Sequence, residues 1–391
     1  MASNMVSLFS LANWKNGLAF KQINFSEKGK PVIKIAELKN GITAQTARTQ
    51  QEFDSDVHLT KGDMVFSWSG NPETSIDVFW YDLPDGWLNQ HIFKVTPNNG
   101  VDKLYLYYLL KFLKPQFTAI ASNKQTTGLG HVTVKDMKEM MVPLPEMAVQ
   151  QAIGAYLHAI DQKAYVNNKI NDNLQQQAYA YFLRLFVENE DPSWHVGTIA
   201  DIGTVVGGGT PSKTKPEYYT EDGIAWITPK DLSIDKSKFI AHGENDISEL
   251  GYRNSSATMM PAGTVLFSSR APIGYIAIAS NEVTTNQGFK SVVPHPEIGT
   301  PFVYYFLIHN LPLIESKASG STFKEVSGSV MKSVEAVIPD GDTLAKFNDF
   351  CRPIFAMQEK LEQENRKLAE MRDSLLPLLM NGEIDVADID A

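Results

Sequence analysis

Two stretches of the chain carry apolar residues at intervals that alternate between three and four positions. One extends from Met147 to Val187, and the other from Thr343 to about Met380. This spacing places a narrow apolar stripe along one side of a helix, which is typical of a coiled-coil seam. A helix of about 40 residues extends roughly 60 Å, longer than the internal helices of a globular domain. The pattern therefore predicts two long helices, and the simplest arrangement for them is an antiparallel coiled coil.

The sequence before each long helix follows a different period. Short runs of alternating apolar residues, broken by Gly, Pro and Asn, predict strands and turns there. Each of these two segments also contains a helical pattern around a Tyr-Tyr pair, at 107–108 and 304–305, and then a strand that ends at Pro143 or Pro339. The tyrosine pairs could stack on nucleic-acid bases, but at helical spacing among leucines they are predicted to belong to the core. Each segment is thus predicted to fold as an α+β domain.

The two halves of the chain repeat each other. Five segments of the first half match segments of the second half in the same order, at an offset that stays between 194 and 201 residues. The clearest matches are KGDMVFSWSG (61–70) with AGTVLFSSRA (262–271), and LNQHIFKV (88–95) with TNQGFKSV (285–292). Such a repeat predicts that both domains share one architecture and that the chain has internal pseudo-two-fold symmetry.

These patterns divide the chain into four regions. They are a first globular domain at 1–146, a first long helix at 147–187, a second globular domain at 188–342, and a second long helix with an acidic tail at 343–391. Pro353 falls inside the second helical pattern, where it is expected to kink the helix or to mark its start.

The predicted helix seam also carries polar residues, among them two asparagines. Asn171 and Asn365 lie at matching positions of the two helical patterns. They either contact a partner or form a buried polar pair that fixes the register of the helices, and the second role is favoured because it is well attested for asparagine. The single cysteine, Cys351, also lies on the seam, so it is predicted to be a small core residue rather than a nucleophile.

The net charge of −10 is unevenly distributed along the chain. Residues 188–340 contain 11 Lys and Arg against 18 Asp and Glu, a net charge of −7, whereas residues 1–146 contain 15 against 14, a net charge of +1. The large excess of basic residues that is typical of a nucleic-acid-binding protein is therefore missing. If the chain binds DNA, a local basic face or a basic partner must supply the attraction to phosphate. The lone cysteine and the lack of any long apolar run predict a cytoplasmic protein.

A glycine-rich segment, VGGGTPSKTK (206–215), invites comparison with nucleotide-binding loops. A P-loop needs a glycine directly before its Lys-Ser/Thr pair, but Ser212 holds that place and Pro211 removes an N–H from the loop. The segment is therefore interpreted as a turn between strands. The eight histidines show no metal-ligand spacing, and no nucleophile elbow or methyltransferase motif occurs in the sequence. The sequence thus predicts a chain without catalytic or metal-binding residues of its own.

Several segments together resemble a known family. In the second half, the segments concerned are GGGTPSKTKPEYYTEDGIAWITPKDL, GTVLFSSRAPIGYIAIA and TNQGF. In the first half they are WKNGLAF, which lacks a Gly-Thr-Pro sequence, and TTGLGHVTVKDMKEMMVPLPEMAVQQAI. The helical stretches contribute IDQKAYVNNKINDNL and LAEMRDSLLPLLMNGEI. Over nearly the whole chain, these segments are similar to target recognition domains and to the central and distal conserved regions of the specificity (S) subunits of Type I restriction-modification systems.

The resemblance implies an α+β fold with two target recognition domains separated by two long conserved helices that pack as an antiparallel coiled coil. Each domain is expected to read one half of a bipartite, asymmetric sequence in double-stranded DNA, while the helices set the spacing and dock two methyltransferase (M) subunits. The cofactors belong to the partners: S-adenosylmethionine to the M subunits, and ATP with magnesium to the restriction (R) subunits that cut unmodified DNA. From the residues alone, two other functions stay open, a coiled-coil scaffold that reads no DNA and a DNA enzyme in its own right.

The candidate DNA-binding residues are polar side chains expected on loops beside the matched strands, because base reading needs paired donors and acceptors on a rigid scaffold. In the second half they are Thr210, Ser269, Arg270, Gln287, Lys290 and Lys324, and in the first half they are Trp68, Ser69, Asn89, Gln90, Lys94, Lys124 and Thr126. Arg270 is the strongest candidate, because only two arginines occur between residues 188 and 340. For each residue the alternative is a polar side chain that stabilises a turn or is merely solvated.

Overall fold

The computed structural model describes residues 4–125, 128–320 and 324–389. The chain divides into two compact units, unit 1 with residues 1–163 and 367–391, and unit 2 with residues 164–366. Each of these units combines one globular half with parts of both long helices. Among the helices of the described ranges, none is long and apolar enough to cross a membrane.

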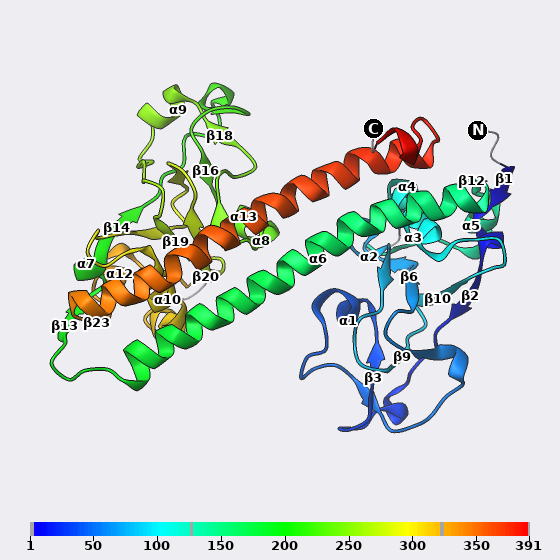
Figure 1. The fold of residues 1–391 in the computed structure, drawn as a ribbon, viewed down its shortest axis with the longest axis horizontal. Helices are drawn as coiled ribbons and strands as arrows, with labels where there is room; N and C mark the ends of the chain where they lie inside the picture. The colour runs from blue at the N-terminus through cyan, green and yellow to red at the C-terminus, as the bar shows by residue number, and fades with distance from the viewer. Residues whose placement is uncertain (1–3, 126–127, 321–323, 390–391) are drawn as a thin grey trace. The chain divides into compact units, whose positions relative to one another are not determined.

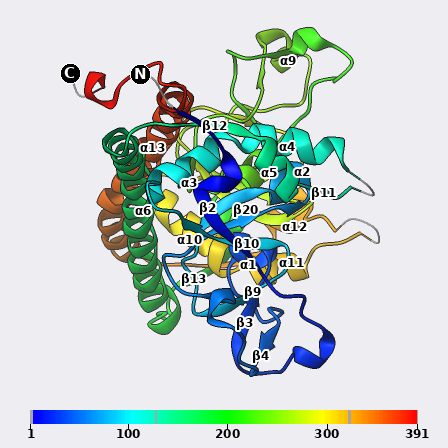
Figure 2. The same cartoon turned by 90° about the vertical axis from the view of Figure 1, so that its right-hand side faces the viewer.

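Unit 1 is built around a four-stranded antiparallel sheet in the order β2-β10-β6-β8, of which β2, β10 and β6 are labelled in Figure 1. Its strands are β2 (Ala12–Asn16), β10 (Ile92–Pro97), β6 (Met64–Ser67) and β8 (Asp77–Trp80). Every residue of β6 is buried, as expected for a central strand with both faces covered. A second small sheet consists of β4 (Arg48–Thr49), β3 (Lys30–Ile33), β9 (Gly86–Leu88) and β5 (His58–Leu59), of which β3, β4 and β9 are labelled in Figure 2.

Unit 2 repeats this sheet and adds one strand. Its order is β14-β22-β19-β20-β17, so the first four strands correspond one by one to β2, β10, β6 and β8. The strands are β14 (Gly203–Gly207), β22 (Lys290–Pro294), β19 (Val265–Ser269), β20 (Ile273–Ala279) and β17 (Phe239–Ile240). The internal repeat is therefore confirmed at the level of topology as well as sequence.

The smaller elements follow the same repeat. The antiparallel pair β1 (Asn4–Ser7) and β12 (Met141–Leu144) corresponds to β13 (His195–Thr198) and β23 (Glu335–Ile338), and the parallel pair β3–β9 corresponds to β16 (Trp226–Ile227) and β21 (Thr284–Thr285). Helices α3 (Lys103–Phe112), α4 (Lys114–Asn123) and α5 (Val134–Glu139) correspond to α10 (Thr300–His309), α11 (Leu311–Ser316) and α12 (Gly328–Lys332).

Short elements fill the connections between these strands and helices. In unit 1 they are α1 (Ile35–Asn40), α2 (Pro72–Ser75), β7 (Ser69–Gly70) and β11 (Gly130–His131). In unit 2 they are α7 (Ile199–Ile202), α8 (Pro229–Ile234), α9 (Glu249–Arg253), β15 (Tyr219–Thr220) and β18 (Asp246–Ile247).

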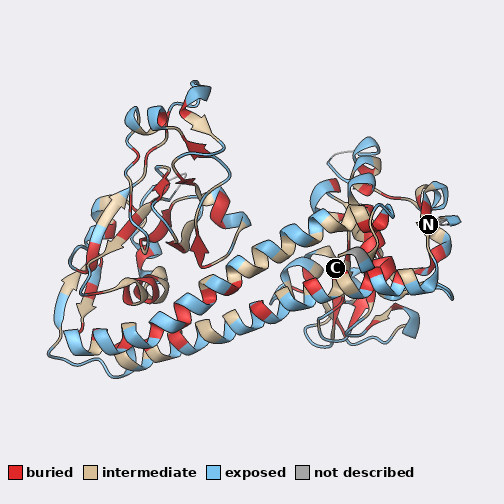
Figure 3. Ribbon diagram, turned by 45° about the horizontal axis from the view of Figure 1, so that its top comes forward, coloured by how far each residue is buried: buried red, intermediate tan, exposed pale blue. Residues whose placement is uncertain are grey.

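The two long helices are α6 (Met147–Leu183), which continues into a π-helical turn at Arg184–Glu188, and α13 (Gly341–Met380). They pack antiparallel within unit 2, where Asn167 meets Asn365 and the Tyr181 ring lies 4.6 Å from the Phe350 ring. Buried positions recur along both helices (Figure 3). Because α13 begins at Gly341, the prediction that Pro353 could mark its start is wrong.

The predicted polar pair between Asn171 and Asn365 requires a correction. Asn365 accepts a hydrogen bond from Asn167 at 2.9 Å and donates one to Asn168 at 2.8 Å. The backbone carbonyl of Asn171 instead accepts from Gln358 at 3.2 Å. The repeat makes Asn171 and Asn365 equivalent positions in the two halves of the chain. Because α6 and α13 run in opposite directions, equivalent positions need not lie opposite each other. Asn365 instead contacts residues one turn before Asn171 in α6.

The tyrosine pairs lie in the core, as predicted, and the second hydroxyl of each pair binds a long helix. In unit 1, Tyr108 donates to Asp161 at 2.7 Å, and Asp161 also accepts from Arg372 at 3.0 Å. In unit 2, Tyr305 donates to Gln175 at 3.0 Å. Burial is the largest cause that raises the pKa of both tyrosines, so both hydroxyls stay protonated donors. Each globular half is thus hydrogen-bonded to a long helix from inside its core.

A buried lysine completes the polar contacts in unit 2. Lys238, only 7% exposed, donates to Gln358 at 2.6 Å and to the Tyr305 hydroxyl at 3.3 Å. Its ammonium lies 4.3 Å from the centre of the Phe355 ring. The carboxylate of Glu362 accepts from the backbone N–H of Lys238 at 2.9 Å. Desolvation by burial lowers the pKa of Lys238 to about 7.

This lowered pKa predicts a pH-dependent stability. Between about pH 7 and 10, Lys238 is neutral in the folded chain but still charged in the unfolded chain, so the folded state binds fewer protons and stability rises with pH. Relative to Lys238→Met, the wild type is expected to gain free energy of unfolding as the pH rises through this window, by at most about 1.4 kcal/mol per pH unit. Denaturant unfolding at pH 6.5 and pH 9.5 measures the difference.

The exposed neighbour Lys236 provides the matched control, because Lys236→Met removes a solvated charge on the same segment. Equal pH dependence of the two variants would contradict the role of Lys238.

Candidate functional site

The glycine-rich turn after β14 is shaped by close backbone contacts. A Cβ atom on Gly208 would lie 1.9 Å from the carbonyl oxygen of Asn286, which only glycine avoids. The backbone N–H of Gly209 donates to Thr285 at 2.8 Å, and its carbonyl accepts from the Trp226 indole at 2.9 Å. Because this N–H is bound within the fold, the segment is a structural turn and not a phosphate cradle, in agreement with its interpretation from the sequence.

The first half makes the same contact without a Gly-Thr-Pro sequence. A Cβ atom on Gly17 would lie 2.2 Å from the carbonyl oxygen of Asn89, and the N–H of Leu18 donates to Leu88 at 2.9 Å. Gly17 and Asn89 thus correspond to Gly208 and Asn286. In both halves a glycine supports the Asn-Gln turn that precedes β10 or β22.

Three of the predicted residues of unit 2 line a single cleft of about 520 Å³. They are Thr210, Arg270 and Gln287, and the Thr210 hydroxyl donates to the Gln287 side chain. The cleft is also lined by residues that were not predicted, among them Lys213, Trp226 and Asn286. Of these residues, Asn286 could have been predicted from the sequence, because it belongs to the Asn-Gln pair shared by both halves.

The loop that carries Arg270 is held by buried serines. Ser268 donates to the carbonyl of Pro272 at 2.9 Å and accepts from the N–H of Tyr275 at 2.8 Å. Ser269 is fully buried, and its hydroxyl donates to Gly288 at 3.1 Å. The prediction that Ser269 contacts DNA is therefore corrected, because its side chain points into the fold and connects the Arg270 loop to the Asn-Gln turn.

Arg270 is about one-third exposed and lies beside a carboxylate. Its Nη1 is 3.5 Å from Glu325, which is also 3.4 Å from the ammonium of Lys290. The Lys290 side chain is only 16% exposed. Lys290 is therefore a further correction, because its donors are directed to Glu325 and to nearby backbone carbonyls. The exposed Lys324 lies next to Glu325, at the edge of the described range.

The corresponding loops of unit 1 are aromatic rather than charged. The Trp68 ring lies 5.9 Å from Phe93 and 5.6 Å from His91, and its indole N–H donates to Asn16 at 3.1 Å. The next residue, Ser69, pairs with His131 in the small ladder β7–β11. Gln90 lies 3.1 Å from the His91 ring and is partly exposed. Trp68, Ser69 and Gln90 are the predicted residues of unit 1 that keep some contact with solvent while lying on loops beside the sheet.

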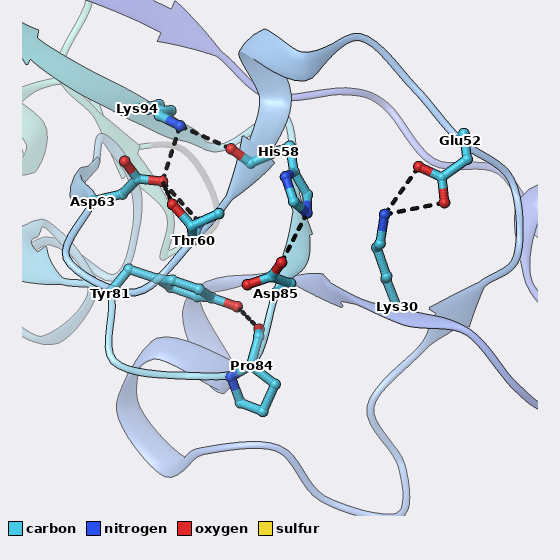
Figure 4. A network of polar contacts seen from close by, with 9 residues as sticks. All are labelled: Lys30, Glu52, His58, Thr60, Asp63, Tyr81, Pro84, Asp85 and Lys94. Atoms are coloured by element: carbon cyan, nitrogen blue, oxygen red, sulfur yellow. Dashed lines mark hydrogen bonds and ion pairs between the residues drawn. The ribbon is translucent and has the colours of Figure 1, made fainter.

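Two more of the predicted residues of unit 1 are held within the fold. The ammonium of Lys94 lies 2.9 Å from Asp63 and 2.8 Å from the carbonyl of His58, with its side chain 21% exposed (Figure 4). Asn89 is 8% exposed. These two predictions are corrected, because the side chains stabilise the fold around them. Lys124 pairs with Asp136 at 2.5 Å but is exposed, so its contact with DNA stays a prediction. Thr126 lies outside the described residues.

Two kinds of reactive centre, a metal site and an activated thiol, are not found in the described ranges. No group of three or more His, Cys, Asp or Glu side chains there could hold a metal ion. Cys351 is fully buried, and desolvation raises the pKa of its thiol to about 12, so the thiol is not activated as a nucleophile.

Comparison with known families gives a match to both halves of the chain. The model of the "Type I restriction modification DNA specificity domain" matches residues 3–176 and again residues 192–363. The two matches contain the two glycine-supported turns and most of both long helices.

Individual relatives agree with this result. The type I restriction enzyme MjaIX specificity subunit of Methanocaldococcus jannaschii is 37% identical over 195 residues, which cover 49% of this chain and 44% of the relative. The HindI specificity subunit of Haemophilus influenzae is 29% identical over 406 residues, covering 83% of this chain and 87% of the relative. The crystal structure of the S subunit of a Type-I restriction-modification system from M. genitalium shares the fold, with a TM-score of 0.61, 18% identity, and coverage of 97% and 96% of the two chains.

The glycine beneath the turn predicts a sharp difference between neighbouring substitutions. Gly208→Ala is expected to lower the free energy of unfolding by on the order of 1–3 kcal/mol or more, because the new Cβ atom collides with a backbone oxygen. Gly207→Ala is the control, since a Cβ atom on Gly207 has no described neighbour within 4 Å. Chemical denaturation of both variants measures the effect, and equal stabilities would contradict the close contact.

Proposed function

Because this chain belongs to the family of type I restriction modification DNA specificity domains, with one copy of the domain in each half, we propose that it selects the DNA sequence for a type I restriction-modification complex. In this proposal each globular half is a target recognition domain that reads one part of a bipartite sequence in double-stranded DNA. The long helices, which contribute to both units, set the spacing between the two parts.

The observation that carries the proposal is a shared framework with different loop tips. Both halves have the same strand order and the same glycine beneath an Asn-Gln turn. Both turns carry a glutamine, Gln90 or Gln287, but where unit 2 presents Arg270 beside its strand, unit 1 presents Ser69, next to Trp68. A common scaffold with different tip chemistry is expected to read two different half-sites, so the full target is asymmetric.

Arg270 and Gln287 have the chemistry that base reading requires. A guanidinium offers paired donors that match O6 and N7 of guanine, and a glutamine amide offers a donor and an acceptor that match N6 and N7 of adenine. Both side chains line the same cleft in unit 2. Thr210 joins them there and holds the Gln287 amide. We therefore assign base reading in unit 2 to Arg270 and Gln287, with Thr210 as a supporting contact.

Partner subunits supply the rest of the activity in this proposal. Two methyltransferase subunits bring S-adenosylmethionine and methylate adenine, and restriction subunits that use ATP with magnesium join the same complex. The net charge of −10 supports a division of labour in which basic partners provide much of the attraction to phosphate. A scaffold that reads no DNA leaves the match of both globular halves to a DNA specificity domain unexplained.

The two arginines of residues 188–340, Arg253 and Arg270, give a matched test. In a complex reconstituted with the methyltransferase subunits, Arg270→Ala is expected to weaken recognition of one half-site by about 1–3 kcal/mol, because a bidentate base contact is lost. Arg253→Ala is the control, since Arg253 is 76% exposed on α9 and pairs with Glu249 on the same helix. Mapping methylated adenines in DNA exposed to each complex measures the change.

The wild-type map itself tests the wider proposal. We expect a bipartite, asymmetric methylated sequence. Methylation without sequence preference, or a pattern unchanged by replacement of this chain, would contradict the function. An unchanged map and affinity for Arg270→Ala alone would remove only the role of Arg270.

A further inference from the structure

Glu325 lies between two cations of unit 2, Arg270 in the loop after β19 and Lys290 at the start of β22. Its carboxylate is 3.5 Å from Arg270 and 3.4 Å from Lys290. About one-third of the Glu325 side chain is exposed, so the group lies at the margin of the surface rather than in the core. We name these three side chains the Glu325 clamp.

The backbone holds Glu325 in place from two sides. Glu325 and Ser319 exchange backbone hydrogen bonds of 2.9 and 3.1 Å, and the next residue, Val326, donates to the carbonyl of Ser269 at 3.0 Å. Glu325 therefore bridges directly to the end of β19, where Arg270 begins its loop. A carboxylate that is anchored in this way can fix the direction of a longer, more mobile side chain beside it.

The other arm of the clamp reaches the Asn-Gln turn. The Lys290 ammonium lies 3.4 Å from the carbonyl of Gln287 and 3.3 Å from the carbonyl of Phe289. Lys290 therefore connects the turn that carries Gln287 to Glu325, and Glu325 connects it to Arg270. A continuous polar chain relates the positions of the two proposed base-reading side chains.

Resting on the proposed function, we propose that Glu325 is a positioning residue that determines the specificity of the second recognition domain. The carboxylate occupies one edge of the Arg270 guanidinium and leaves its other N–H donors for a base edge. It also repels phosphate, so Arg270 is a poor contact to DNA of arbitrary sequence. The same group thus favours the correct half-site and penalises wrong ones.

The residues at the corresponding positions of the first half do not form this clamp. Ser69 forms a β-bridge with His131, and Arg270 forms a β-bridge with Glu325 between the corresponding segments. Ser69 therefore corresponds to Arg270, and His131 corresponds to Glu325. By the register of β10 and β22, Phe93 corresponds to Lys290. None of these three residues reproduces the two cations around a carboxylate, so the clamp concerns one half-site only.

The test uses the full chain in complex with its methyltransferase subunits. Duplexes carry the sequence found by methylation mapping, either intact or scrambled in the second half-site, and binding is titrated at several salt concentrations. For Glu325→Gln we expect the ratio of affinities for intact and scrambled duplex to fall by about fivefold or more. Binding of scrambled duplex should strengthen, and its log–log salt dependence should steepen by about 0.9, the contribution of one additional phosphate contact.

Three further variants separate the effect of charge from that of geometry and from general damage. Glu325→Asp keeps the charge but shortens the side chain, so it should lose discrimination while its salt dependence stays that of the wild type. In the double variant Arg270→Ala with Glu325→Gln, the second change should have no further effect on discrimination. His131→Gln, at the corresponding place in the first half, should leave the ratio at the second half-site unchanged.

The outcomes distinguish this inference from the function on which it rests. If Arg270→Ala weakens the second half-site but Glu325→Gln and Glu325→Asp keep the wild-type ratio, the positioning role is overturned and the function stands. If wild-type complex does not distinguish intact from scrambled duplex, the proposed function itself fails.

Discussion

The apolar core of each unit is shared between a sheet and the two long helices, and the rest of the structure depends on this sharing. In unit 1, Leu157 of α6 and Leu379 of α13 belong to the same buried cluster as strands β6 and β10. In unit 2, Phe182 of α6 and Phe347 of α13 join the cluster around β19 and β22. Burial of each such side chain contributes roughly 1.5–3 kcal/mol. Neither sheet can cover its inner face without the helices, so compact units cross the boundaries that the sequence pattern suggests.

Polar groups inside these shared cores are satisfied differently in the two units. In unit 1 the cation that balances Asp161 is Arg372, from α13. In unit 2 the neutral Gln175 accepts from the tyrosine instead, and the basic group, Lys238, comes from the segment before β17 and donates to Gln358. A buried ammonium is costly unless it is well surrounded, and the amide, hydroxyl and aromatic faces around Lys238 offset part of that cost. The repeat thus preserves the position of the polar contact but not its chemistry.

The site follows the same division between constant framework and variable tips. Gly17 and Gly208 allow two backbones to approach closely in corresponding places, and the turns above them carry Gln90 and Gln287. Such rigid support is what loop side chains need if they are to read base edges. In unit 2, Arg270 and Lys290 converge on the carboxylate of Glu325, whereas Ser69, Phe93 and His131 hold the corresponding positions in unit 1. In the proposed function, this difference allows one architecture to serve two distinct half-sites.

Periodicity and self-similarity in the sequence determined the main features of the fold. The alternating spacing of three and four predicted α6 and α13, the matched segments predicted the repeated sheet, and the pairs at 107–108 and 304–305 were assigned to the core. These features are local or repeated, so each is visible in a single linear pattern. Arg270, Gln287 and Thr210 were also named as DNA-binding candidates, which stays a prediction, and only the structure shows that the three line one cleft.

Only the tertiary structure decided which polar side chains face solvent and which partners they meet. The sequence predicted that Ser269, Lys94 and Lys290 lie at the surface. In the structure, each side chain donates a hydrogen bond to a carbonyl or carboxylate of a distant segment. Glu325 gave no signal in the sequence, since its meaning depends on a bridge to Arg270. The pairing of Asn365 with Asn167 was likewise hidden. Periodicity reports which face of an element is buried, whereas the register between elements and the direction of polar side chains depend on contacts between residues far apart in the chain.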